Sequence, residues 1–309
     1  SSLADRAWGR ESAVYRITGV LSVIGGWFIT AGAAFLICFI VALLIYVGGI
    51  AAMAAMVGIA VYMLIHSRLI YKKKIRKEAM QEEIGTTIKR LRETTDKHEA
   101  LLLFRQHSRE ELNDVINFAS KEFCNSIHSF MNEDLHGLRQ VMSDIEEKKT
   151  YLKQVKRIGT LGVTQLDYEI AVDKGLYYYQ GNDFASEIVY SIRRMTEPAK
   201  EHVDNHFRPL SEAQKSDISK ITDSIMIFLN HCSNMISTND YHRMTDLVTD
   251  SIILNTNLTT LKKTELKRIQ GQEGGTKVSM VYLNMLQEAQ NVVSFTGNLL
   301  KVSHKFQME

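Results

Sequence analysis

The heptapeptide NEDLHGL at residues 132–138 returns about 100 residues later as TNDYHRM at residues 238–244. Asp134 aligns with Asp240, and a hydrophobic residue closes each copy. An aspartate in this place is well suited to cap the helix that follows it. Repeats of this length are longer than those of solenoid proteins, so the pattern predicts two copies of a three-helix bundle.

Apolar residues at helical spacing surround both copies and predict six helices. The expected helices span residues 109–131, 133–157 and 164–206 in the first unit, and 212–236, 239–269 and 277–305 in the second. Capping boxes at residues 108–111 and 211–214 mark two helix starts. Gly159 and Gly162 are expected to interrupt one helix, and QGQEGGT at residues 270–276 another. Because the 309 residues include only two prolines, we expect an all-α fold.

A long apolar run precedes the helical units. Residues 17–65 carry no charged side chain. One bilayer crossing takes about 20 apolar residues, so the run predicts a hairpin of two transmembrane helices. We place its turn at Gly48 and Gly49, because paired glycines permit a tight reversal. Ala51 and Ala55 are four residues apart, a spacing that lets two membrane helices approach closely.

Basic residues flank the apolar run on both sides. Arg6, Arg10 and Arg16 precede it, and YKKKIRK at residues 71–77 follows it. Such flanks place both ends of the hairpin in the cytoplasm. The second cluster would also suit lipid head groups or nucleic acid, but its position at the membrane edge already explains it. We therefore expect no nucleic-acid partner.

Acidic residues four apart on the third helix of the first unit are candidates for metal binding. The pairs are Glu169 with Asp173 and Asp183 with Glu187. Each pair shares one helical face and suits a hard divalent cation, although a solvated charged face has the same pattern. His202 and His206 would suit zinc only with a third ligand. The sequence shows no nucleophile motif and no glycine-rich phosphate loop after a strand, so we expect no enzyme.

Residues 10–45, RESAVYRITGVLSVIGGWFITAGAAFLICFIVALLI, resemble the last transport-domain segment of bacterial inorganic phosphate transporters of the PiT family. The family carries Trp-x-x-Thr and then small residues in this helix, matched here by Trp27 and Thr30, which we expect to pack in the membrane. The tandem of helical units resembles PhoU-like domains, whose third helices carry Glu/Asp-x-x-x-Asp motifs. Residues 169–173 fit that motif and residues 183–187 fit it loosely. In the second unit Val292 stands where the second acidic residue belongs.

The resemblance implies a function for the intact protein, namely symport of inorganic phosphate with Na⁺ or H⁺ across the bacterial inner membrane. The Gly-Ala-Asn-Asp repeats that bind substrate in this family are absent, so we expect the substrate-binding residues before Ser1. Membrane lipid would surround the hairpin, and residues 71–309 would be cytoplasmic. The tail would regulate transport, packing under the pore or forming a homodimer, with a divalent metal as a candidate ligand of the PhoU-like domain.

The expected order of domains follows from these features. It is a cytoplasmic lead-in that ends a truncated transport domain (1–16), two transmembrane helices (17–70), a basic juxtamembrane connecting helix (71–107), a first PhoU-like three-helix bundle (108–208) and a second (209–309). The alternatives are a two-span receptor or signalling protein and a membrane-anchored scaffold, each with a helical cytoplasmic domain. The sequence preceding Ser1 would distinguish them, since a transporter requires more membrane spans there.

Overall fold

The computed structural model describes residues 27–64 and 86–94, both with gaps, and residues 96–271 and 275–308 without a break. Every regular element among these residues is a helix, which confirms the all-α prediction. The chain divides into two units, residues 1–79 and 80–309.

The described residues of the first unit are helical and expose their large apolar side chains. Trp27 is 72% exposed, Tyr46 90% and Ile50 85%. Gly49 has a φ of 55°, a left-handed conformation at the place where the sequence predicts a reversal. Within the part of the chain that the structure describes, no helix is both long and apolar enough to cross a membrane.

The predicted hairpin residues fall partly outside the described residues. Thr30, Gly48 and Ala55 lie in helical stretches, whereas Ala51 is outside the described residues, as are residues 1–26. The membrane hairpin therefore stays a prediction.

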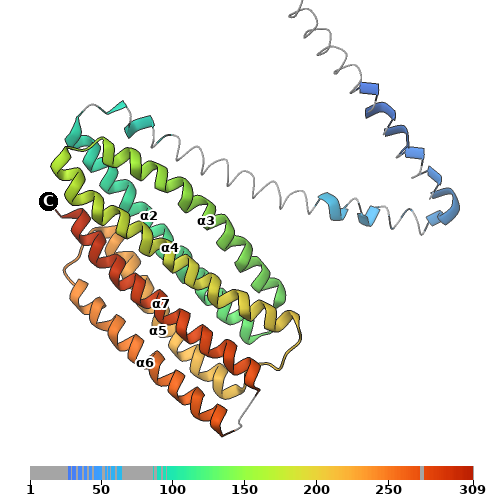
Figure 1. Ribbon diagram of the computed structural model, residues 1–309. Helices are drawn as coiled ribbons and strands as arrows, with labels where there is room; N and C mark the ends of the chain where they lie inside the picture. Colours follow the sequence, from blue (N-terminus) through green and yellow to red (C-terminus); the bar gives the residue numbers. More distant parts are fainter. Residues whose placement is uncertain are drawn as a thin grey trace, which may run out of the picture. The chain divides into compact units, whose positions relative to one another are not determined.

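Six helices form the second unit (Figure 1). They are α2 (Lys97–Met131), α3 (Leu135–Thr164), α4 (Tyr168–Asp204), α5 (Glu212–Thr238), α6 (Met244–Gln270) and α7 (Thr276–Gln307). About half of the predicted connecting helix, residues 71–107, lies outside the described residues. α2 begins within it, after a non-helical Asp96 whose side chain accepts a hydrogen bond from the His98 backbone N–H.

The third helices of the two predicted units form the centre of the bundle. α4 and α7 share the most extensive interface, with α3 against α4, α6 against α7 and α2 against α5. Figure 1 shows α4 and α7 side by side, with α3 and α6 on opposite outer flanks. One hydrophobic core draws on all six helices, from Phe123 on α2 to Leu299 on α7. Both predicted units thus bury their apolar faces in the same core.

The two copies of the repeated heptapeptide have matching backbones but different caps. Glu133 and Asn239, which align, have left-handed φ values of 54° and 56°. As predicted, Asp134 caps its helix, accepting a hydrogen bond from the Gly137 backbone N–H at 3.0 Å. The same prediction for Asp240 is wrong, because α6 begins only at Met244.

The delay of α6 has a physical reason in the turn before it. Tyr241 turns toward α7, where its hydroxyl lies 2.8 Å from the Ser303 hydroxyl and its ring packs on His304. Asp240 instead accepts from the His242 backbone N–H at 3.1 Å. Because of these contacts the chain stays non-helical after Asp240, and α6 begins four residues later, at Met244.

Apart from the start of α6, the predicted helix boundaries in the second half agree with the structure to within about two residues. Ser211 and Gln214 form the predicted capping box at the start of α5. α6 ends at Gln270 and α7 begins at Thr276, as the glycine-rich segment predicts. The capping box at residues 108–111 is wrong, since Ser108 and Glu111 are buried in the middle of α2.

Gly159 and Gly162 do not interrupt a helix, contrary to the prediction. Both lie inside α3, where they make room for aromatic rings. A Cβ atom on Gly159 would lie 2.1 Å from Cε1 of Tyr178, and one on Gly162 would lie 2.5 Å from Cδ2 of Phe104. The glycines are needed for packing rather than for a turn.

Candidate functional site

The predicted metal carboxylates all lie on α4, at separate levels of the helix. Glu169 and Asp173 are exposed near its start, and Asp183 is exposed farther along. Glu187 is half-buried one turn later. The two members of each pair share a helical face, as the spacing predicts. The two pairs lie too far apart along α4 to bind one ion together.

Three of the four carboxylates have a cation beside them. The ion pairs are Asp173 with Lys174 at 3.4 Å, Asp183 with Lys156 at 3.4 Å and Glu187 with Arg194 at 3.6 Å. Among the described residues, no group of three or more His, Cys, Asp or Glu side chains is placed to hold a metal ion. The divalent metal site stays a prediction.

The two histidines that share helical spacing do not share a helical face. α4 ends at Asp204, and His206 follows it in a left-handed conformation with a φ of 52°. His202 is buried, and its Nε2 lies 2.8 Å from the carbonyl oxygen of Arg208. If this nitrogen carries the proton, it donates to that carbonyl and ties the end of α4 to the chain leading into α5.

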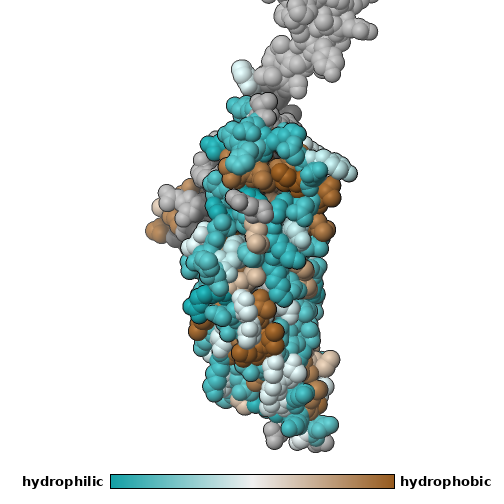
Figure 2. Space-filling model, turned by 90° about the vertical axis from the view of Figure 1, so that its left-hand side faces the viewer, coloured by the Kyte–Doolittle hydropathy of each residue, from teal (hydrophilic) through white to brown (hydrophobic). Residues whose placement is uncertain are grey.

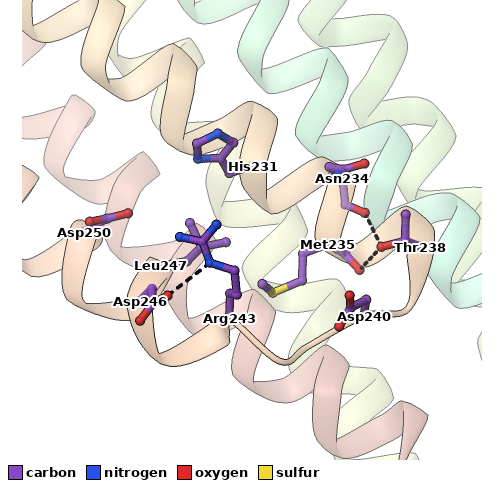
Figure 3. Close-up of a pocket in the computed structure, with 9 residues that line it drawn as sticks. All are labelled: His231, Asn234, Met235, Thr238, Asp240, Arg243, Asp246, Leu247 and Asp250. Atoms are coloured by element: carbon purple, nitrogen blue, oxygen red, sulfur yellow. Dashed lines mark hydrogen bonds and ion pairs between the residues drawn. The ribbon is translucent and has the colours of Figure 1, made fainter.

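A pocket lies between the end of α5 and the start of α6 (Figure 3). Its volume is about 220 Å³. Met235 and Leu247 are buried and form its apolar base. The polar lining comes from α5, from the turn and from α6, and comprises His231, Asn234, Thr238, Asp240, Arg243, Asp246 and Asp250.

Negative charge prevails in this pocket. Three aspartates line it, and Arg243 is its only guanidinium. Arg243 Nε donates to Oδ2 of Asp246 at 3.2 Å, as Figure 3 shows. An excess of carboxylates attracts a cationic group such as an amine or guanidinium, and it disfavours phosphate. The pocket is therefore suited to a basic ligand and unsuited to the substrate that the resemblance implies.

The sequence does not predict the pocket, because no motif links its residues. Asp240 was interpreted as a helix cap, and Asp246 and Asp250 belong to the charged side of a helix. One difference between the two copies bears on the pocket. Tyr241 stands where the first copy has leucine, and its hydroxyl contacts Ser303 on α7, so Asp240 does not cap α6.

No protein-family model matches the chain, and no curated protein matches it. The likeness to phosphate transporters and PhoU-like domains therefore rests on the sequence features quoted above.

Proposed function

We propose that the chain is the closing membrane and regulatory portion of a cation-coupled inorganic phosphate transporter of the bacterial inner membrane. In this proposal residues 17–70 form the membrane hairpin and the six-helix bundle is its cytoplasmic regulator. The intact protein would transport phosphate with Na⁺ or H⁺.

The observation that carries the membrane part of the proposal is the exposure of apolar side chains between residues 27 and 64. Phe28, Phe35 and Val47 are 77%, 70% and 77% exposed. Contiguous apolar surface of this kind is unfavourable in water at about 25 cal/mol per Å² and marks a surface that lipid or protein covers. By contrast, the face of the bundle in Figure 2 is mainly hydrophilic, with small separate hydrophobic areas.

The bundle is better suited to regulation than to transport. All six helices contribute to its main core, so the part around that core would move as one body. The pocket between α5 and α6 is acidic, so we place the phosphate path elsewhere. A rigid body joined to the last membrane helices can bias the pore by its own movement or by pairing with a second copy.

Membrane attachment is tested by fractionation of cells that express the chain. We expect it to resist alkaline carbonate extraction, because lipid covers the apolar segment. Replacing Leu43 and Val57 together with arginine should weaken this attachment, whereas Leu102→Arg, an equally exposed leucine on α2, should not. Equal extraction of all three proteins would contradict the proposal.

Regulation is tested in the intact transporter by deleting residues 96–308. Phosphate uptake is measured at low and at high external phosphate in cells that lack other phosphate transporters. We expect the deletion to retain uptake and to change its dependence on external phosphate. Uptake that is the same as that of the intact protein at both concentrations would rule out regulation by the bundle.

A further inference from the structure

Four glutamates are buried among the residues that the structure describes, and three of them have donors to their carboxylates. The donors are Lys121 and Asn125 for Glu122, Gln214 and Arg268 for Glu265, and Arg194 and Asn291 for Glu288. Each of these three carboxylates thus has a cation and an amide beside it. The fourth, Glu111 on α2, has no hydrogen-bond donor to its carboxylate among these residues.

Glu111 is 3% exposed. Neither of its carboxylate oxygens has a hydrogen-bond partner among the described residues. His107, one turn earlier on α2, is also mostly buried, and its Nε2 lies 3.8 Å from Oε2 of Glu111. That distance is too long for a hydrogen bond. An ionised carboxylate in such a place is strongly unfavourable, so the protonated form is preferred.

The charged and titratable groups around Glu111 do not neutralise it. On α2 these are His107 and Asp114, on α3 Lys148, and on α4 Tyr178. The ammonium of Lys148 is already paired with Asp114. The Tyr178 hydroxyl is buried and has no hydrogen-bond partner among the described residues. From α7 the contact is apolar, since the Phe306 ring packs on the Tyr178 ring at 5.7 Å between centroids.

The proton affinities follow from this setting. Burial raises the pKa of Glu111 from 4.5 to about 8, with Lys148 opposing the rise and Asp114 adding to it. Burial also lowers the pKa of His107, with Glu110 opposing. Burial and the charge of Glu111 raise the pKa of Tyr178, which the Asn182 side chain partly offsets. At pH 7 all three side chains are therefore neutral.

A small hydrophobic cluster lies next to Glu111, apart from the main core, and we call it the end core. Its members are Leu91, Leu101, Phe104, Ile158, Leu166, Tyr178 and Phe306. Phe104 is seven residues before Glu111 on α2, hence on the same helical face. Tyr178 belongs to both the end core and the surroundings of Glu111. A charge on Glu111 would thus adjoin the end core.

The second half of the bundle has a cation that the first half lacks. Arg268 on α6 donates to Asp217 at 2.7 Å and to Glu265 at 3.3 Å. The second helices of both repeats end in Lys-Arg-Ile, which aligns Arg268 with Arg157. Arg157 is exposed on α3. The second half therefore places a guanidinium against Glu265, whereas the aligned arginine of the first half is turned to solvent.

We propose that Glu111 is a proton-binding switch: in its protonated form the buried carboxyl permits α2 to pack against α4, and its ionisation opens the end core. The proton passes to bulk water, and the carboxylate reaches water only when the start of α2 moves away. The main core has paired carboxylates and stays closed. This switch is a property of the bundle and does not depend on the proposed transport function.

Protonation is measured directly on the full chain in lipid nanodiscs by infrared spectroscopy, which detects the C=O stretch of a protonated carboxylic acid. We expect a band that disappears with a midpoint near the Glu111 pKa of about 8. The band should be absent in Glu111→Gln and present in Glu110→Gln, the matched change at the exposed neighbouring glutamate. A wild-type spectrum with no carboxyl band titrating between pH 6 and pH 9 would refute the proposal, even if Glu111→Gln fails to fold.

Opening is measured by hydrogen exchange, after correction for the intrinsic effect of pH. Each pH unit above the pKa favours the open, ionised form about tenfold. Peptides from residues 97–107 and 302–307 should therefore exchange about tenfold faster per pH unit above the midpoint, while residues 115–127 in the main core should not. Glu111→Gln should abolish this acceleration and Glu110→Gln should retain it. The same profile in wild type and Glu111→Gln would overturn the switch.

Discussion

Gly159→Ala tests whether the glycines of α3 serve packing rather than helix interruption. The added Cβ would lie 2.1 Å from Cε1 and 2.6 Å from the hydroxyl oxygen of Tyr178. That ring is 2% exposed and packs between the tilted rings of Phe104 and Phe306, so it cannot swing into solvent. Either the ring or α3 has to move by more than 1 Å to restore an ordinary contact distance, roughly 3.4 Å or more.

The magnitude follows from two opposing terms. Alanine favours the helix over glycine by about 1 kcal/mol. Overpacking in a rigid core costs about 1–3 kcal/mol, and this clash belongs at the upper end. We expect the free energy of unfolding to fall by about 2 kcal/mol, which lowers Tm by roughly 4–8 °C in a domain of this size.

The assay is thermal unfolding of the full chain followed by circular dichroism. Gly181→Ala is the matched control, because its Cβ would meet Leu112 and Val302 at 3.8 Å, an ordinary contact. That variant should gain up to about 1 kcal/mol from helix propensity. A Gly159→Ala protein as stable as Gly181→Ala would refute the packing argument and restore a conformational role for the glycine.

Two further predictions concern the repeat. Asp134→Ala should lower the free energy of unfolding by about 1 kcal/mol, because the helix cap is lost. Asp240→Ala should lower it by less, because Asp240 does not cap α6. Urea unfolding of both variants measures the difference. Arg268→Met leaves two carboxylates without their cation and should cost about 3–5 kcal/mol at pH 7, whereas Arg157→Met at the aligned exposed position should change the free energy by less than about 0.5 kcal/mol. Because acid neutralises the stranded carboxylates, the Arg268→Met deficit should shrink as the pH falls, and a deficit independent of pH would contradict this explanation.

Periodicity and turn chemistry were enough to predict the six helices, because each helix buries one continuous stripe. The break at residues 271–275 and the cap at Ser211 rest on local chemistry that the sequence displays directly. Gly159 could not be interpreted in the same way. Its role depends on Tyr178, which meets it only after α3 and α4 pack together.

The role of Glu111 also could not be predicted from the local sequence. Its spacing from Ser108 satisfies a capping box, yet both residues are in the middle of a helix that begins at Lys97. A local motif does not reveal how much chain before it is also helical. The nearby cation, Lys148, does not pair with Glu111 because it is bound to Asp114, and this contact forms only when α2 and α3 pack together.

The pairing of α4 with α7 also bears on symmetry. A single three-helix unit would leave the apolar face of its third helix uncovered, and the simplest cover is a second copy related by a two-fold axis. The tandem is equivalent to such a dimer with its subunits joined by a short tether. The tether raises the effective concentration of one half near the other, so the pairing does not depend on how much protein the cell makes.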